Sequence, residues 1–305
     1  MVLRSLGLRC IAITVLSTAP ARAATVFADS VPAGGYTMGN VYVASGATYD
    51  DTAAVLGAPS PIVGAGSAYA GVLSPFNAHY ETSDLVAIGR GGALTLHLSS
   101  AVPVSTAGPE IGVFTSASFL DQDYPNGAVA NPAHTAAFAE YGAERTAVVE
   151  VATTPGNFVS LGRITFDKPA NYYANASAPY QYPPPASPAV ADFGKPFTGD
   201  LASLSGRTFP QLLAALDGSA GGTWIDVPTG LGLSQVNYVR FSDPMWLLGD
   251  GTLAETRTSI YDPTYVKPAD LFIDAVAGAN VPEPVGPGLL AIISLLRRRR
   301  RGRGG

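Results

Sequence analysis

Short runs of β-branched and aromatic residues, each closed off by Gly, Pro, Asn or Asp, most limit how this chain can fold. Residues 93–100 (ALTLHLSS) alternate between apolar and polar side chains, which predicts a strand with one buried face. Residues 146–152 (TAVVEVA) and 158–166 (FVSLGRITF) flank a Pro-Gly turn, which predicts a hairpin. The 34 glycines and 25 prolines among 305 residues favour short strands and turns over long helices.

Other runs of the same kind predict further strands, over residues 110–117, 236–243 and 271–278. One segment, TFPQLLAALDGSA, predicts a helix. Thr208 and Gln211 form a T-x-x-Q capping box, and Gly218 follows the last apolar residue. A chain made mostly of strands, with one or two short helices, is expected to be mainly β and to fold as a β-sandwich.

The first 23 residues have the three parts of a secretory signal peptide. A positively charged start precedes an apolar stretch over residues 11–16, and Ala21 and Ala23 give the small-x-small cleavage pattern. We therefore expect residues 1–23 to be a signal helix that enters the Sec translocon and is removed by signal peptidase. Cys10, the only cysteine, lies in this leader, so the mature chain is expected to have no disulfide.

The last 25 residues combine a short motif, an apolar run and a cluster of arginines. The motif is Val281, Pro282, Glu283 and Pro284. The arginines are Arg297, Arg298, Arg299, Arg300, Arg301 and Arg303. As a helix, the apolar residues 285–296 would rise about 18 Å, against a hydrocarbon core of about 30 Å. We expect a short apolar helix that holds the chain in the membrane only transiently, with the arginines as a cytoplasmic stop.

This order of features resembles the PEP-CTERM sorting tail of proteins exported by Gram-negative bacteria of planctomycete or proteobacterial type. The resemblance implies that an exosortase-type membrane enzyme recognises the tail and cuts near the motif. It also implies a destination at the cell envelope, the outer surface or the extracellular matrix, after transient anchoring in the inner membrane. The expected organisation is a signal peptide (1–23), an exported β-sandwich (24–280) and a sorting tail (281–305).

The body of the chain resembles exported cell-surface β-sandwiches that carry the same kind of tail. The matching stretches are residues 53–59, 86–98, 109–117, 148–162, 236–244 and 260–276. The 148–162 hairpin and the C-terminal end of the body are also similar to discoidin or galactose-binding-like domains. These resemblances imply a sandwich of jelly-roll or galactose-binding-like type, and they bring no catalytic residues with them.

Charge is segregated along the chain. Nine of the 18 basic residues lie in the leader and the tail, which leaves 9 basic and 23 acidic residues over 24–296. A body of this charge repels phosphates, so nucleic acid is not expected as a partner.

The sequence contains few groups that could carry out chemistry. The three histidines, His79, His97 and His134, do not stand at metal-ligand spacing, and no G-x-S-x-G or P-loop motif occurs. His97 lies on the polar face of its predicted strand, where a solvated side chain is expected. We therefore expect a non-enzymatic protein, with a polysaccharide hydrolase built on two opposed carboxylates as an alternative.

Carboxylates are the main polar groups in the body of the chain that could bind a ligand. The loop DQDYPNG holds Asp121, Asp123 and Asn126, a set of hard oxygen ligands that resembles a loose calcium loop; the alternative is a solvated loop that binds no metal ion. No other cofactor is predicted. Four aspartates near the C-terminal strands are interpreted as loop-stiffening Asx turns; they are Asp243, Asp262, Asp270 and Asp274.

Aromatic residues suggest a ligand. Tyrosines gather around the proline-rich stretch 179–188, and two tryptophans follow; they are Tyr172, Tyr173, Tyr180, Tyr182, Trp224 and Trp246. Exposed aromatic rings stack on sugars, which makes a carbohydrate-binding module for exopolysaccharide the second functional hypothesis. The alternative is that the two tryptophans belong to the core.

Overall fold

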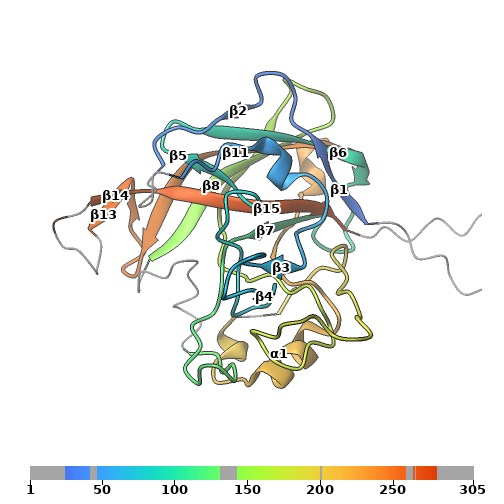
Figure 1. Cartoon of the computed structure of the whole chain (residues 1–305). Helices are drawn as coiled ribbons and strands as arrows, with labels where there is room; N and C mark the ends of the chain where they lie inside the picture. The colour runs from blue at the N-terminus through green and yellow to red at the C-terminus, as the bar shows by residue number, and fades with distance from the viewer. Residues whose placement is uncertain are drawn as a thin grey trace, which may run out of the picture. The chain divides into compact units, whose positions relative to one another are not determined.

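The computed structural model describes residues 25–41, 47–130, 143–199, 201–258, 264 and 266–279. All of them belong to one compact unit, which is mainly β (Figure 1). Eleven strands form its large antiparallel sheet: β1 (Val26–Ser30), β2 (Tyr36–Thr37), β5 (Val86–Gly89), β6 (Ala93–Pro103), β7 (Ile111–Thr115), β8 (Ala143–Ala152), β9 (Val159–Thr165), β10 (Thr223–Ile225), β11 (Gln235–Leu248), β12 (Leu253–Ala254) and β15 (Asp270–Gly278).

The main path of this sheet runs β10-β7-β15-β1-β6-β11-β8-β9. Strand β1 joins its two halves, because Val26 and Phe27 pair with β15 whereas Ala28 and Ser30 pair with β6. A register shift between Ala28 and Ser30 marks the change of partner. Such a shift bends a strand, so one half of the sheet can fold over the other. The result is a nearly closed sheet of the sandwich or barrel kind, as expected from the sequence.

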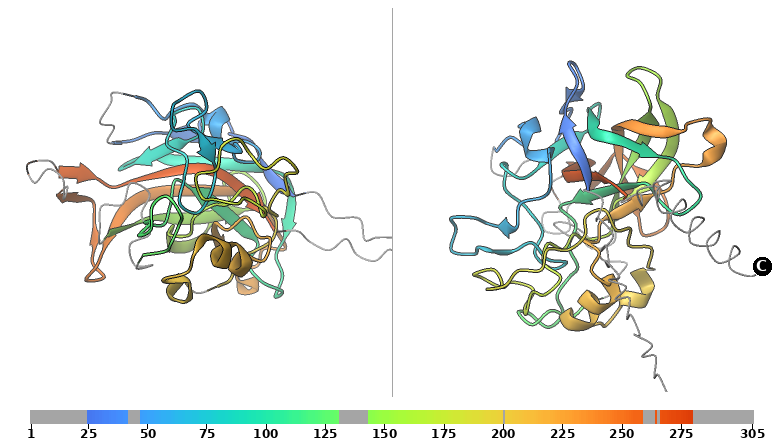
Figure 2. Two further views of the ribbon diagram at one scale, coloured as in Figure 1. Left: turned by 60° about the horizontal axis from the view of Figure 1, so that its bottom comes forward. Right: turned by 90° about the vertical axis from the view of Figure 1, so that its right-hand side faces the viewer.

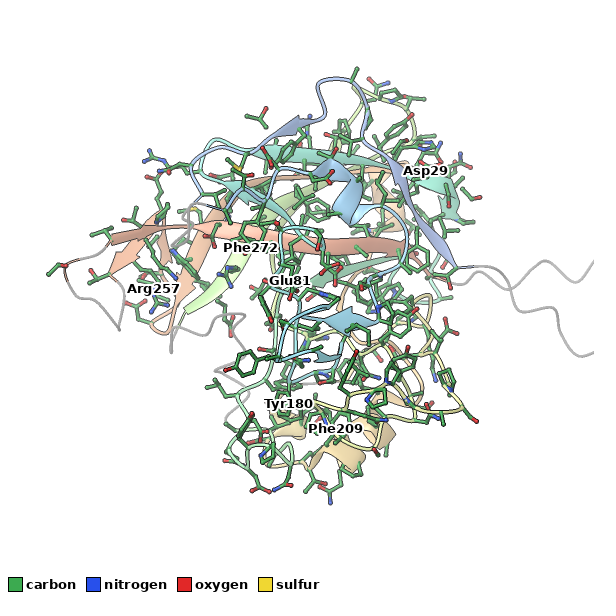
Figure 3. All side chains as sticks on the ribbon, viewed as in Figure 1. Asp29, Glu81, Tyr180, Phe209, Arg257 and Phe272 are labelled. Atoms are coloured by element: carbon green, nitrogen blue, oxygen red, sulfur yellow. The ribbon has the colours of Figure 1, made fainter. Side chains whose placement is uncertain are left out.

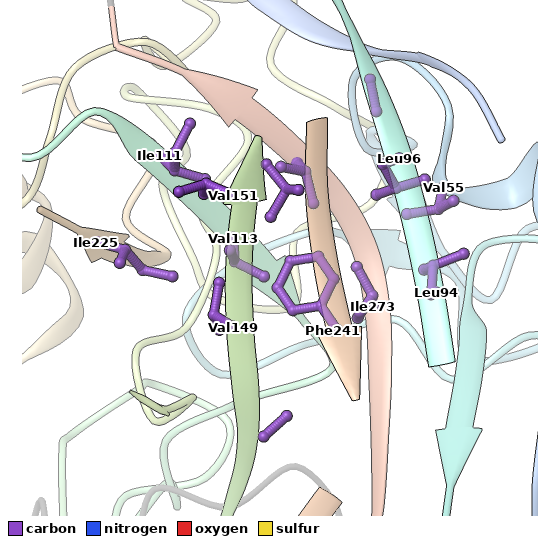
Figure 4. Close-up of a cluster of buried hydrophobic side chains, with 14 of the residues drawn as sticks. Val55, Leu94, Leu96, Ile111, Val113, Val149, Val151, Ile225, Phe241 and Ile273 are labelled. Carbon is purple, nitrogen blue, oxygen red and sulfur yellow. The ribbon is translucent and has the colours of Figure 1, made fainter. Parts of the chain in front are cut away.

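The largest apolar core lies between the two halves (Figure 4). Leu94 and Leu96 of β6 and Phe241 of β11 enter it from one half, and Val113 of β7 and Ile273 of β15 enter it from the other. All five side chains are fully buried. The alternation of residues 93–98 therefore belongs to a half-buried strand, as expected, and its leucines point into this core.

The strands predicted from the sequence are confirmed as β6, β7, β8, β9, β11 and β15. The predicted hairpin is the antiparallel pair β8–β9. The predicted helix is α1 (Phe209–Leu216), and the Gln211 side chain accepts the N–H of Thr208 at 3.0 Å. Its C-terminal cap is Asp217, which already has a positive φ of 49°, so the helix ends at Leu216 and its cap lies one residue before Gly218.

Helix α1 belongs to a second, smaller core at the opposite end of the unit from the large sheet (Figures 1 and 2). It buries Phe209, Leu212 and Leu216 against Phe76 and Leu204. The short elements of this unit are the strand pairs β3 (Ile62–Val63) with β4 (Gly71–Val72) and β13 (Thr256–Thr258) with β14 (Val266–Pro268), and the 3₁₀ helices η1 (Thr52–Val55), η3 (Leu201–Leu204) and η4 (Thr229–Leu231).

Both predicted targeting segments lie outside the described residues, and so does Asp262. The signal helix, its cleavage site, the motif at 281–284 and the arginine cluster therefore stay predictions. Within the described part of the chain, no helix has the length and apolar character needed to cross a membrane.

The shared core gives a direct test of this architecture. We expect Leu96→Ala to lower the free energy of unfolding by about 2–5 kcal/mol, because Leu96 is fully buried and its loss leaves a cavity. The matched control is Leu253→Ala in β12, where the leucine is exposed and the loss should stay below about 1 kcal/mol. Urea denaturation of both variants measures the difference. Equal losses would contradict the placement of the core.

Candidate functional site

A buried histidine among carboxylates is the main candidate site. His79 follows β4, and Glu81 and Asp84 lie in the same loop before β5 (Figure 3 labels Glu81). The His79 side chain has no exposed surface, whereas Glu81 is 24% and Asp84 17% exposed. One ligand atom from each residue lies within 4.8 Å of the others. Within the described residues, no other group of three His, Cys, Asp or Glu side chains comes this close together.

Hydrogen bonding fixes which face of the His79 ring meets the carboxylates. The Nε2 atom lies 2.9 Å from the carbonyl oxygen of Ser60, and a carbonyl can only accept, so Nε2 carries a hydrogen. The Nδ1 atom points toward Asp84 Oδ2 at 3.3 Å and Glu81 Oε2 at 3.9 Å. In a neutral ring with this tautomer, Nδ1 presents a lone pair to two acidic groups.

A third acidic residue, Asp274, approaches His79 from the sheet. Its Oδ2 atom lies 4.0 Å from Nε2, and its side chain is 2% exposed. The register between β15 and β7 shifts between Ile273 and Ala275, so Asp274 occupies a bulge inside a fully buried strand. Bulges redirect side chains, and this one places a carboxylate beside the imidazole.

The pKa values show how strongly these groups act on one another. Burial lowers the pKa of His79, but the hydrogen bond to Asp84 and the charge of Asp274 outweigh it and raise the pKa to about 9. Burial raises the pKa of Asp274 to about 7, although the nearby His79 opposes the change. The cluster therefore attracts positive charge to a place where water is largely excluded.

Sequence reasoning missed this cluster because it treated His79 as isolated. One signal was present: Asp274 interrupts an otherwise apolar run, LFIDAVAG, and a charged residue in such a run needs a partner when the strand is buried. The Asx-turn interpretation of Asp274 and Asp270 is wrong, because both lie buried in β15. Asp270 instead accepts from Arg145 Nε at 3.0 Å. Asp243 likewise lies within β11 and pairs with Arg163.

The loop predicted to bind calcium is organised around Asp121. Its Oδ1 atom accepts the N–H groups of Asp123 and Ala128, both at 2.9 Å, and its Oδ2 atom accepts that of Gly127 at 3.2 Å. Asp123 and Asn126 are exposed in the same turn. These bonds give Asp121 a role in shaping the loop, and the calcium site stays a prediction.

The aromatic residues separate into buried and exposed groups. Trp246 is buried with the guanidinium groups of Arg145 and Arg257 over its ring at 5.1 and 5.3 Å, and Trp224 donates to the carbonyl of Gly221 at 2.9 Å. Both tryptophans therefore pack against other residues of the protein, as the alternative to a sugar-stacking role predicted. Tyr172 and Tyr173 also contact the cores, with ring centroids 4.8 Å apart.

Three tyrosines are strongly exposed instead: Tyr69, Tyr124 and Tyr182. The loops that carry them adjoin one another. The Tyr124 and Tyr180 rings lie 5.2 Å apart, and the N–H of Val72 in β4 donates to the carbonyl of Gln181 at 2.9 Å. We call Tyr69, Tyr124 and Tyr182 the exposed tyrosine group. Of these, only Tyr182 belongs to the set named from the sequence.

His97 provides a useful contrast to His79. Its ring is 34% exposed on β6, where Nδ1 lies 2.7 Å from Asp29 Oδ1. This agrees with the solvated side chain expected from the alternation of the strand. The Asp29 carboxyl has a lowered pKa, mainly because of its hydrogen bond to His97.

Comparison of the chain with protein-family models and with curated proteins finds no match. The interpretation of the two candidate sites therefore depends on their geometry.

The raised pKa of His79 can be checked by NMR. In metal-free protein, we expect the His79 ring to remain an imidazolium through pH 7 and to lose its proton only near pH 9, because Asp84 and Asp274 stabilise the charged form. The His79→Gln variant assigns the resonance by its disappearance. A titration at or below the ordinary value of 6.5 would contradict the electrostatics described here.

Proposed function

We propose that this is a non-enzymatic protein of the cell surface or extracellular matrix, exported as a β-sandwich and sorted through its C-terminal tail. The observation that carries the proposal is the order of features along the chain: signal peptide, body, Pro-Glu-Pro motif, apolar run, arginines. The compact antiparallel β unit lies between these two ends and supports the proposal. Its finer assignment to the jelly-roll or galactose-binding-like type is part of the same proposal.

The proposed route has three partners. The Sec translocon moves the chain across the inner membrane, and signal peptidase cuts after Ala23. The tail then halts in the membrane because residues 285–296 are apolar and the arginines stay on the cytoplasmic side. An exosortase-type enzyme cuts near Val281–Pro284 and releases the β-sandwich to the envelope.

Intact-mass spectrometry of the protein from its native host tests this route. We expect the secreted fraction to contain a chain that begins near Ala24 and ends near Pro284. A Pro282→Ala/Pro284→Ala variant should keep its arginines and stay with the membrane, because the motif is lost. Pro287→Ala, a proline outside the motif, is the matched control and should be processed normally. Retention of the arginines in the wild-type protein would contradict the sorting proposal.

Carbohydrate binding is the second candidate function, and the exposed tyrosine group favours it. Tyr69 is 84%, Tyr124 74% and Tyr182 63% exposed, although tyrosine rings normally bury much of their surface. Their loops adjoin through the Tyr124–Tyr180 contact and the pairing of Val72 with Gln181. Flat rings exposed on adjoining loops are suited to stacking on sugars, so exopolysaccharide is the proposed ligand.

Retention on immobilised exopolysaccharide from the host tests the second function. We expect Tyr124→Ala and Tyr182→Ala to weaken retention about tenfold each, because each loses one stacking surface of roughly 1–1.5 kcal/mol. Val266→Ala removes an exposed apolar side chain from β14 and serves as the control. If the two tyrosine variants bind as well as the control, this function is excluded for the tyrosine group.

A further inference from the structure

We propose that His79, Glu81 and Asp84 bind a divalent transition-metal ion, best matched by Zn²⁺, through Nδ1 of the histidine and one oxygen of each carboxylate. This site is distinct from the predicted calcium loop, and it does not depend on export or on sugar binding. It rests on the geometry of three side chains in one short loop and on buried polar atoms that have no hydrogen-bond partner.

Two polar atoms of the cluster are buried with no hydrogen-bond donor between them. His79 Nδ1 and Glu81 Oε2 are both buried, and as long as Nδ1 carries no proton, neither has a hydrogen-bond partner. Because Nε2 donates to Ser60, Nδ1 needs a proton, a metal ion or a hydrogen-bond donor, and the ionised carboxylates of Glu81 and Asp84 that face it cannot donate. A neutral ring left as it is would hold a lone pair against two carboxylates, an arrangement that costs free energy.

A metal ion satisfies the three facing atoms more completely than a proton does. A proton on Nδ1 reaches Asp84 Oδ2 at 3.3 Å, but Glu81 Oε2 at 3.9 Å lies beyond hydrogen-bond distance. A proton therefore serves one carboxylate and leaves Glu81 Oε2 unsatisfied. An ion between the three atoms contacts both carboxylates and Nδ1 at once, so it satisfies every group that faces this point.

The spacing between His79 Nδ1 and Asp84 Oδ2 also fits metal coordination. Bonds of about 2.0–2.2 Å from Zn²⁺ to nitrogen and oxygen, at roughly tetrahedral angles, place ligand atoms about 3.3–3.6 Å apart. The separation of His79 Nδ1 and Asp84 Oδ2, 3.3 Å, already falls in this range. Glu81 Oε2, at 3.9 Å from Nδ1, must come a few tenths of an ångström closer to that atom, and its side chain is partly exposed. One nitrogen with two carboxylate oxygens favours a transition metal over Ca²⁺, which prefers oxygen ligands alone.

The surroundings of His79 also match those of a metal ligand. A metal-bound histidine commonly donates its other ring N–H to a carbonyl or carboxylate, which fixes the tautomer and increases the basicity of the ligand. Here Ser60 O accepts from Nε2 at 2.9 Å, and Asp274 Oδ2 lies 4.0 Å away on the same side. We assign Asp274 as a positioning residue, because it contacts the ring and not the proposed ion.

Three protein ligands leave at least one coordination position open. Glu81 and Asp84 are partly exposed, so an ion can enter from solvent and keep a water molecule. An ion held here would also fix the loop before β5 against β15, since His79 lies against Asp274 of that strand.

Titration of the full body of the protein with ZnCl₂ after removal of metal by a chelator tests the proposal. Isothermal calorimetry should give one ion per chain, and saturating Zn²⁺ should raise the melting temperature by about 5 °C through preferential binding to the folded state. Asp84→Asn and Glu81→Gln keep the shape of the side chains and change their charge. Each should weaken binding by more than the roughly 10–100-fold typical for loss of an outer-shell partner.

The matched control is Asp29→Asn, which removes a carboxylate from the exposed His97 pair and should bind Zn²⁺ like the wild-type protein. NMR of the zinc-loaded protein should show His79 without a proton at Nδ1 and with its Nε2 hydrogen retained. Three results would overturn the proposal: no zinc binding by folded wild-type protein, binding that Asp84→Asn leaves unchanged, or a His79 ring that keeps a proton on Nδ1 in saturating Zn²⁺.

Discussion

Strand β15 is buried on both faces, and this burial determines what its neighbours must supply. Leu271 and Ile273 fill the core between the two halves of the sheet, whereas Phe272 and Ala275 pack on the other side. A strand buried in this way can carry a charged residue only if the protein supplies a partner. Asp270 has Arg145, and Asp274 has His79. The buried Asp274 of the sheet therefore requires a partner, and this partner is the histidine of the candidate metal centre.

The position of Asp274 in β15 also determines where the candidate metal centre lies in the fold. The bulge at Asp274 directs a carboxylate out of the strand, and the loop between β4 and β5 brings His79 to meet it. Glu81 and Asp84 come with the histidine because they lie only two and five residues further along the loop. The exposed tyrosine group lies on other loops, so sugar binding and metal binding could be lost independently.

Much of the fold could be predicted because its signals are local. Alternation in 93–98 and the capping residues around α1 are properties of a few neighbouring residues, and the structure follows both. The change of partner in β1 and the meeting of His79 with Asp274 join residues far apart in the sequence, so no local pattern indicates them. The sequence also could not show which tyrosines are exposed. Tyr124 is exposed and Tyr173 is buried, and this difference depends on tertiary packing.

Anomalous diffraction at the zinc absorption edge, from crystals of the protein grown with Zn²⁺, would show the proposed ion directly. We expect a single strong peak at bonding distance, about 2.0–2.2 Å, from His79 Nδ1 and from one oxygen each of Glu81 and Asp84. A well-ordered map with no peak between these three side chains would contradict the proposed site. In that case the cluster would be a buried imidazolium held by carboxylates.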